Sequence, residues 1–224
     1  MKWNPQQWLS PRVMIRSNFI LVISFILLAV ASLYGWGWLS VLDREIGLDI
    51  IEDQNDFLTP IFIAVTELGG TYVAVILLTI VSIYVFKWQG RPDLAVWFIL
   101  TVSLGAGALN QFFKFLFERP RPPIQHLVEQ GGYSFPSGHS MGATILYGSI
   151  VFLLVQLGKK RWMKWLALFL AATMIVIIGI SRIYLGVHYP SDVIGGFSLG
   201  AAWLAACIGA YGLWKERQKK EAND

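Results

Sequence analysis

The sequence predicts an all-α integral-membrane protein, a six-transmembrane-helix bundle formed as a single domain over residues 1–224. Its residues are 55% hydrophobic and only 14% charged, whereas a soluble domain carries about 25% charged residues. Its apolar runs approach or exceed the ~20 residues that a helix needs to cross a bilayer. The one cysteine, Cys207, lies within an apolar run, so neither a disulfide within the chain nor a thiolate metal site is expected.

Six apolar runs are predicted to span the membrane: 18–40, 58–86, 94–113, 141–157, 165–182 and 191–214. The first is longer than the core of a cleaved signal peptide, which has about 7–15 apolar residues, so we expect it to be retained. The second is long enough to tilt, or to break at Gly69-Gly70. The stretch VLDREIGLDIIEDQ between these two runs is expected to lie on the membrane surface, with its isoleucines on the membrane and its acidic residues in water.

The distribution of basic residues predicts which side each loop faces, because Lys and Arg concentrate in cytoplasmic loops. With the N-terminus in the cytoplasm, five of the 18 basic residues fall outside, and the others, from Lys2 to Lys220, fall inside. Both termini are therefore predicted to be cytoplasmic. The net charge of +4 reflects this topology, and without a basic stripe interleaved with aromatic residues no nucleic-acid partner is expected. The five outer residues are Arg44, Lys114, Arg119, Arg121 and Arg182.

The first outer segment of interest is KFLFERPRPP, at the end of the third run. Its prolines prevent the helix from continuing and hold the chain extended, so Arg121 is expected to project from a stiff loop. Lys114 ends the helix, and a basic side chain that extends along the membrane edge is an alternative interpretation for it and for Arg121. Arg119 is expected to contact the surface or a lipid headgroup.

The second segment is SFPSGHSM, which comes directly before a long apolar run. Ser137 or Ser140 is expected to cap the helix that follows. The unpaired N–H groups of a helix N-terminus bind anions, and Gly138 lets an anion approach the backbone closely. His139 lies in the first turn, where it could deliver a proton to a bound anion. An ordinary capped helix with an interfacial histidine is the alternative.

The third segment is SRIYLGVHYPSD. Arg182 lies at the outer end of the fifth run, and His188 and Asp192 lie four residues apart at the start of the sixth. Residues four apart on a helix share a face. Asp192 is therefore expected to accept a hydrogen bond from one ring nitrogen of His188, which leaves the other nitrogen available as nucleophile or base.

Together, the three segments bring three cations, a helix N-terminus and two histidines to the outer ends of the helices. Three fixed cations suit a tetrahedral dianion. Phosphoryl transfer is the chemistry that fits best, because its catalysis depends mainly on positioning and charge stabilisation.

These segments contain all fixed positions of a known signature. Lys114 is followed after six residues by Arg121 and Pro122; Pro136 to His139 read PSGH; and Ser181-Arg182 is followed after five residues by His188 and after three more by Asp192. This pattern resembles the three-part signature of the type 2 phosphatidic acid phosphatase family. The size and the layout of the spans resemble bacterial phosphatidylglycerophosphatase B-type membrane enzymes.

The resemblance implies a role for each matched residue. His188 would attack phosphorus and form a phosphohistidine, Asp192 would orient His188, and His139 would protonate the leaving group. It implies no metal and no cofactor, and it implies phosphorylated membrane lipids and the bilayer as partners. The enzyme would lie in the bacterial plasma (inner) membrane, with its site facing the periplasm or outside. The residues expected to bind the phosphate oxygens are Lys114, Arg121, Ser137, Gly138 and Arg182.

The expected activity is hydrolysis of phosphate monoester or pyrophosphate lipids, with phosphatidylglycerol phosphate, phosphatidic acid and undecaprenyl pyrophosphate as candidates. A phosphatase dedicated to undecaprenyl pyrophosphate is one alternative. A lipid or anion transporter is another, although it would need charged residues along a path at the membrane midplane. The sequence does not rank the lipids or give the oligomeric state. The roles of Glu67, within the second run, and of His126, which matches no signature position, also stay open.

Overall fold

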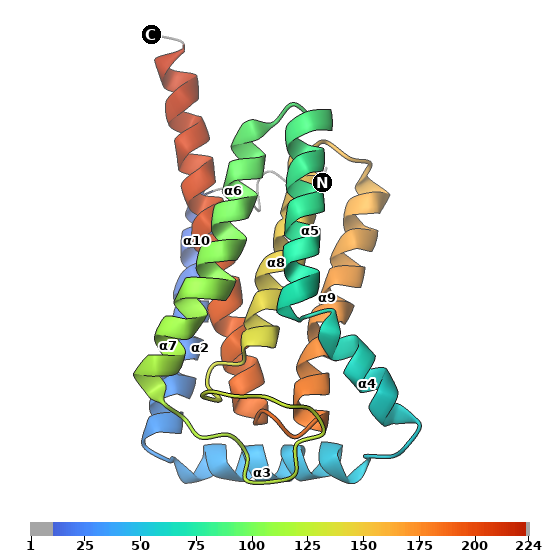
Figure 1. Ribbon diagram of the computed structural model, residues 1–224. Coiled ribbons are helices and arrows are strands. Elements are labelled where there is room, and N and C mark those ends of the chain that lie inside the picture. The colour runs from blue at the N-terminus through green and yellow to red at the C-terminus, as the bar shows by residue number, and fades with distance from the viewer. Residues whose placement is uncertain (1–10, 223–224) are drawn as a thin grey trace.

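The computed structural model describes residues 11–222 and, in the first helix, the side chains of Met14 and of residues from 18 onward. Within this range the chain is a bundle of helices, and no strand is present (Figure 1). The prediction of an all-α fold is thus confirmed. Lys2, which the predicted topology placed in the cytoplasm, lies outside the described residues.

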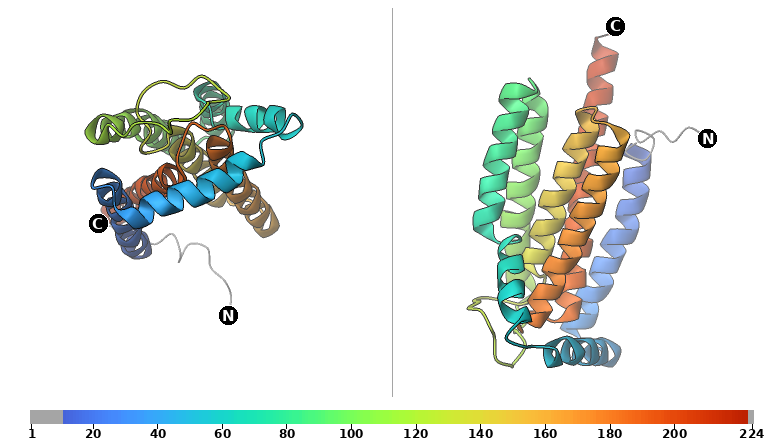
Figure 2. Two further views of the ribbon diagram at one scale, coloured as in Figure 1. Left: turned by 90° about the horizontal axis from the view of Figure 1, so that it is seen from below. Right: turned by 90° about the vertical axis from the view of Figure 1, so that its right-hand side faces the viewer.

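Most of the helices run along the bundle axis, and α3 crosses one end of it (Figures 1 and 2). By length and composition, five helices of the described chain can cross a membrane: Thr71–Trp88, Pro92–Phe117, Gly138–Gln156, Arg161–Tyr184 and Pro190–Glu221. The pair α2 and α3 adds a sixth candidate if it is counted as one span. The elements are α2 (Pro11–Leu33), α3 (Gly37–Glu52), α4 (Leu58–Glu67), α5 (Thr71–Ile83), the π-helix η1 (Tyr84–Trp88), α6 (Pro92–Val102), the π-helix η2 (Ser103–Leu109), α7 (Asn110–Phe117), α8 (Gly138–Gln156), α9 (Arg161–Tyr184) and α10 (Pro190–Glu221).

The first apolar run ends earlier than its predicted limit at residue 40. Helix α2 stops at Leu33, and the chain bends by 94° before α3 begins. Gly35 makes this turn with φ of 59°, a left-handed conformation that favours glycine and ends helices. The predicted surface stretch does form a helix across the bundle, but Asp43 does not face water as expected. Asp43 is buried against the protein.

The second run breaks at Gly69-Gly70, one of the two predicted outcomes. Helix α4 ends at Glu67 and α5 begins at Thr71. Gly69 lies so close to α9 that an added Cβ would come within 2.6 Å of Cγ2 of Ile178. Because α4 ends at Glu67, this residue lies outside α5, the helix that can cross the membrane, and its side chain is exposed.

Close packing of α8 against α10 brings two of the predicted motifs together. An added Cβ at Gly196 would lie 2.7 Å from the carbonyl oxygen of Ser137, and one at Gly200 would lie 2.9 Å from that of Met141. Small residues allow helix backbones to approach this closely in membranes. As a result, the backbone N–H of Ser137 donates to the carbonyl oxygen of Asp192 at 3.0 Å.

Candidate active site

The predicted site residues gather at the end of the bundle that α3 crosses, which we call the site end (Figure 1). An irregular loop of residues 118–137 joins α7 to α8 there. It begins at Glu118, whose φ of 45° ends α7, and the prolines that follow keep it from becoming helical. The loop is tied to the bundle because the N–H of Leu127 donates to the carbonyl oxygen of Leu185 at 3.1 Å.

Five of the eight predicted site residues line one cavity of about 430 Å³: Lys114, Arg121, Gly138, His139 and His188. The cavity continues along an apolar wall made by α5, α6 and η2, including Ala74, Val75, Leu78, Val102 and Ala106. A polar end and an apolar continuation are therefore parts of one space.

The other three predicted site residues lie behind the cavity lining. Ser137 is fully buried at the N-cap position of α8, but its hydroxyl makes no capping hydrogen bond. Instead, this hydroxyl accepts a hydrogen bond from the hydroxyl of Ser140 at 3.0 Å. Arg182 donates to Oγ1 of Thr66 at 2.7 Å and to Oε1 of Gln130 at 2.6 Å, and its buried Nε has no hydrogen-bond partner. Asp192 lies behind His188.

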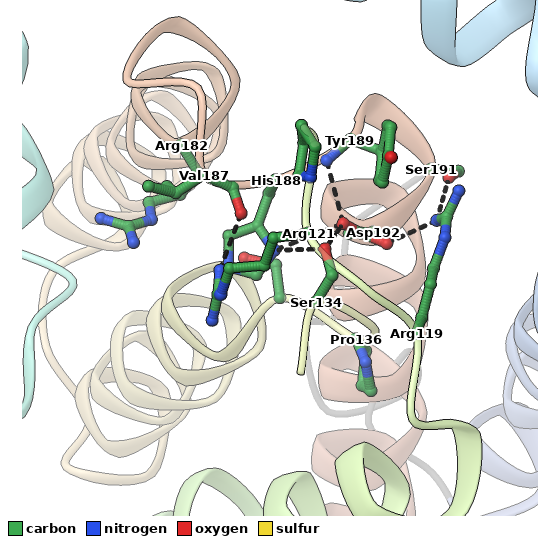
Figure 3. Close-up of polar contacts among 12 residues, drawn as sticks. Arg119, Arg121, Ser134, Pro136, Arg182, Val187, His188, Tyr189, Ser191 and Asp192 are labelled. Carbon is green, nitrogen blue, oxygen red and sulfur yellow. Dashed lines mark hydrogen bonds and ion pairs between the residues drawn. The ribbon is translucent and has the colours of Figure 1, made fainter. Parts of the chain in front are cut away.

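The contact between His188 and Asp192 is present, but the predicted reason for it is wrong. Helix α10 begins at Pro190, so His188 lies in the preceding loop and the pair does not share a helix face. Asp192 instead caps the helix, since its Oδ2 accepts the N–H of Tyr189 at 2.9 Å. The same oxygen lies 3.4 Å from Nδ1 of His188 (Figure 3).

The environment of His188 favours a neutral imidazole. Burial lowers the pKa of His188 to about 3; Asp192 opposes this shift, and the nearby cations Arg182 and Arg121 add to it. With Nδ1 directed to Asp192, the other nitrogen, Nε2, lies 3.3 Å from Nη1 of Arg121. Nε2 is therefore the ring atom available for nucleophilic attack.

Arg121 is held at the cavity by backbone carbonyl groups. It donates to the carbonyl oxygens of Val187 at 2.7 Å, Gly131 at 2.8 Å and Gly132 at 3.0 Å. Burial lowers the pKa of Arg121, and the carboxylate of Asp192 opposes that shift. An arginine stays charged in proteins, so Arg121 offers its charge to an anion in the cavity.

Arg119 does not contact the surface or a lipid headgroup as predicted. Its side chain is 16% exposed and donates to Oδ1 of Asp192 at 2.5 Å and to Oδ2 of Asp43 at 2.8 Å. Arg119 and Arg121 approach the His188–Asp192 pair from opposite sides (Figure 3). The prediction failed because Arg119, next to a membrane-edge helix, has the same local pattern as a basic residue at the lipid boundary.

Sequence reasoning also missed several polar side chains around the site. The hydroxyl of Ser134 donates to Oδ2 of Asp192 and lies 3.4 Å from Nδ1 of His188. Asn110 and Gln130 line the cavity. No spacing in the sequence marks these residues, although Ser134 is the first residue of the segment SFPSGHSM. His126 lies 3.1 Å, through Nε2, from the carbonyl oxygen of Pro122 and does not line the cavity.

The sequence is similar to those of known phosphatases. The chain is 35% identical over 162 residues to phosphatidylglycerophosphatase B of Bacillus subtilis (strain 168). The aligned region covers 70% of this chain and 77% of that protein. The chain is 27% identical over 156 residues to an undecaprenyl-diphosphatase of Sulfolobus acidocaldarius, covering 68% and 70% of the two chains.

A solved structure is also similar. The crystal structure of a transmembrane PAP2-type phosphatidylglycerolphosphate phosphatase from Bacillus subtilis matches with a TM-score of 0.80 at 31% identity, and the match covers 86% of this chain and 94% of that one. Residues 95–215, more than half of the chain and including all three motifs, match the family model of the PAP2 superfamily. The resemblance predicted from the motifs is thus confirmed, and the chain belongs to the PAP2 superfamily.

Proposed function

We propose that this PAP2-type membrane phosphatase removes phosphate from phosphorylated lipids such as phosphatidylglycerol phosphate, phosphatidic acid and undecaprenyl pyrophosphate. The observation that carries the proposal is the cavity that joins two cations and two histidines to an apolar wall. A phosphorylated lipid has the same two parts, because its headgroup is anionic and its acyl or prenyl chain is apolar. The activities named for the similar proteins support this choice of substrates.

The geometry supports a mechanism in two steps. In the first, Nε2 of His188 forms a bond to phosphorus while the bond from phosphorus to the leaving oxygen breaks, and His139 gives that oxygen a proton. In the second, water attacks phosphorus, the phosphorus–nitrogen bond breaks, and His139 takes the proton released by the water. Inorganic phosphate leaves, and the neutral imidazole of His188 is restored.

The remaining groups of the site stabilise charge in this scheme. Asp192 holds Nδ1 of His188 and offsets the positive charge that forms on the ring. Lys114 and Arg121 bind the equatorial oxygens, with Arg182 adding positive charge behind Gln130. Together these cations take the place of the Lewis acid in a metal-dependent phosphatase. Gly138 starts α8, so its N–H points from a helix N-terminus that favours anions.

The apolar wall gives a place for the lipid chain. Ala74, Val75 and Leu78 come from α5, and Val102 and Ala106 come from α6 and η2. A chain that lies between these helices brings its phosphate to the site end. The site thus serves a substrate that stays in the membrane.

A panel of purified lipids tests the function. The protein should release phosphate from at least one of the three lipids, with or without excess chelator, and Asp192→Asn should abolish the release. Strong preference for the pyrophosphate lipid would instead identify a dedicated undecaprenyl pyrophosphate phosphatase, the alternative that the Sulfolobus relative supports. Failure on every lipid, or magnesium-dependent recovery after chelation, would contradict the proposal.

We place the enzyme in the bacterial plasma (inner) membrane, with both termini cytoplasmic and the site facing the periplasm or outside. The bias of Lys and Arg toward the end opposite the site supports this orientation. Single cysteines in a Cys207→Ala background provide the test. A cysteine at position 125 should react with an impermeant reagent added outside, whereas Lys160→Cys should be protected in intact cells. Labelling of Lys160→Cys from outside would reverse the orientation.

A further inference from the structure

A buried polar network adjoins the catalytic pair but lies outside the three-part signature. Oδ2 of Asp43 accepts hydrogen bonds from Nη2 of Arg119 at 2.8 Å and from the hydroxyl of Ser191 at 2.7 Å. Oδ1 of Asp43 accepts the N–H of Ser191 at 2.8 Å. Nη1 of Arg119 donates to Oδ1 of Asp192 at 2.5 Å. The guanidinium of Arg119 therefore bridges two buried carboxylates.

The two oxygens of Asp192 have separate sets of partners. Oδ2 accepts from Ser134 and from the N–H of Tyr189, and it lies 3.4 Å from Nδ1 of His188. Oδ1 accepts from Arg119. Because both oxygens are occupied, the carboxylate cannot rotate without breaking a hydrogen bond. Because Asp192 is fully buried, its charge also needs a nearby cation.

Arg119 does not belong to the phosphate cavity. It lines a different cavity of about 310 Å³ under α3, together with Asp43, and it faces the side of the catalytic pair opposite Arg121 (Figure 3). The planar guanidinium of Arg119 can hydrogen-bond two carboxylates at once, whereas the single ammonium of a lysine is less suited to this bridging geometry. The position of Arg119 therefore suits a role toward Asp192, and Arg119 is absent from the lining of the cavity that holds Lys114, Arg121 and His139.

We infer that Arg119 is a positioning residue for catalysis, held in place by Asp43 of α3, and that it keeps Asp192 ionised with Oδ2 directed at His188. This inference rests on the proposed function, since it assigns a purpose to Arg119 through the nucleophile. It also gives α3 a role in the reaction, because α3 supplies the carboxylate that anchors the arginine.

The test compares Arg119→Gln, Arg119→Lys and Arg44→Gln for phosphate release from the best lipid of the panel. Arg44 is a matched control, since it lies next to Asp43 on α3 with its side chain 66% exposed and paired to Glu45. Arg119→Gln should lower kcat by about 10- to 100-fold, the range found when the hydrogen-bond partner of a metal-binding side chain is removed, and should leave KM within about threefold. Arg119→Lys should recover part of kcat, and Arg44→Gln should behave as wild type.

A second readout uses pH. The charged and titratable groups near His188 are Asp192, Arg121, Arg182 and His139. Loss of the Arg119 cation leaves the negative charge of Asp192 less compensated, which favours the protonated imidazole of His188. The acid limb of kcat/KM should therefore move to higher pH in Arg119→Gln, and it should move down or stay in place in Asp43→Asn. A purely structural role would reduce the amount of folded protein without moving this limb.

The outcomes separate the two proposals. If the wild type releases phosphate from no lipid, the proposed function fails and the inference fails with it. If the wild type is active but Arg119→Gln keeps the wild-type kcat and pH profile, the inference alone is wrong. The inference is also wrong if Arg119→Gln raises KM at constant kcat, because that result would mean that Arg119 contacts the lipid headgroup. Should Arg119→Gln not fold, Arg119→Lys and Ser191→Ala carry the test through kcat, because both keep the positive charge but weaken the bridge between the two carboxylates. An unchanged kcat in both would overturn the inference.

Discussion

The two ends of the bundle use the same types of residue in different ways. At the end opposite the site, Arg91 donates to both carboxylate oxygens of Asp93, each at 3.0 Å, and to the hydroxyl of Tyr211 at 2.9 Å. Lys215 adds a contact to Asp93 at 3.5 Å. Each of these cations thus has a carboxylate partner, and the cluster joins the start of α6 to the last turns of α10.

At the site end, the cations that surround the cavity contact neutral acceptors instead. Lys114 donates to the carbonyl oxygen of Tyr133 at 2.5 Å, and Arg121 donates to backbone carbonyls. Arg182 contacts Thr66 and Gln130, and its Nε has no partner. Arg91 and Lys215 thus have a carboxylate partner and form a structural cluster. Lys114, Arg121 and Arg182 contact neutral acceptors, which leaves their positive charge for an anion in the cavity.

The largest change should follow replacement of the proposed nucleophile, His188. His188→Ala should abolish turnover and also any phosphoenzyme, because it removes the ring nitrogen Nε2 that lies beside Arg121. Rapid quench with labelled lipid, followed by detection of acid-labile phosphate on the protein, measures this. A phosphoenzyme that still forms in His188→Ala would show that the nucleophile lies elsewhere in the site.

Loss of the proton donor should have an effect that depends on the leaving group. His139→Ala should lower kcat by about 10²- to 10⁴-fold on a lipid with an alkoxide leaving group, the usual range for general acid catalysis. The loss should be smaller on an activated aryl phosphate, whose leaving oxygen needs little protonation. Equal losses on the two substrates would remove His139 from the role of general acid.

The contrast between the ends can be tested with one substitution at each. Arg121→Gln should lower kcat/KM by about 10²- to 10³-fold, comparable to losing one donor that stabilises the transition state. Arg91→Gln is the matched control at the opposite end and should leave kcat/KM unchanged. If both variants lost activity equally, the distinction between compensated and uncompensated cations would have no functional meaning.

The smallest expected effect is on stability at the end opposite the site. Arg91→Gln removes a partly exposed ion pair, with side chains 30% and 17% exposed, so unfolding should become easier by about 1 kcal/mol or less. Thermal unfolding in detergent, followed by tryptophan fluorescence, should show a small decrease in Tm at unchanged activity. An unchanged Tm would mean that the cluster adds no net stability.

The sequence predicted well those features that depend on local composition. Hydropathy located the apolar runs, since a helix that crosses the bilayer needs about 20 mostly apolar residues. The early end of the first run was missed because residues 34–40 are themselves mostly apolar, and only the left-handed turn at Gly35 separates them from α2. The motif residues of three distant segments were correctly expected to meet, and five of them line one cavity.

The direction of individual side chains could not be predicted. Arg119 and Arg121 are two residues apart in the same proline-rich segment, yet Arg119 contacts Asp192 and Arg121 lines the cavity with His139 and His188. That difference depends on how the loop is held by distant residues such as Leu185. The burial of Asp43 likewise depends on Ser191, which is far away in the sequence, and no local pattern records that contact.

The bond between Asp43 and Ser191 has a consequence for the order in which the protein is completed. These residues are separated by 148 positions, and ribosomal synthesis delivers α3 long before α10. Until α10 enters the bundle, Asp43 and Arg119 lack Ser191 and Asp192, and His188, the proposed nucleophile, has no carboxylate behind it. The nascent chain therefore carries Lys114, Arg121 and Arg182 before His188 gains the carboxylate of Asp192, and the arrival of α10 completes the site.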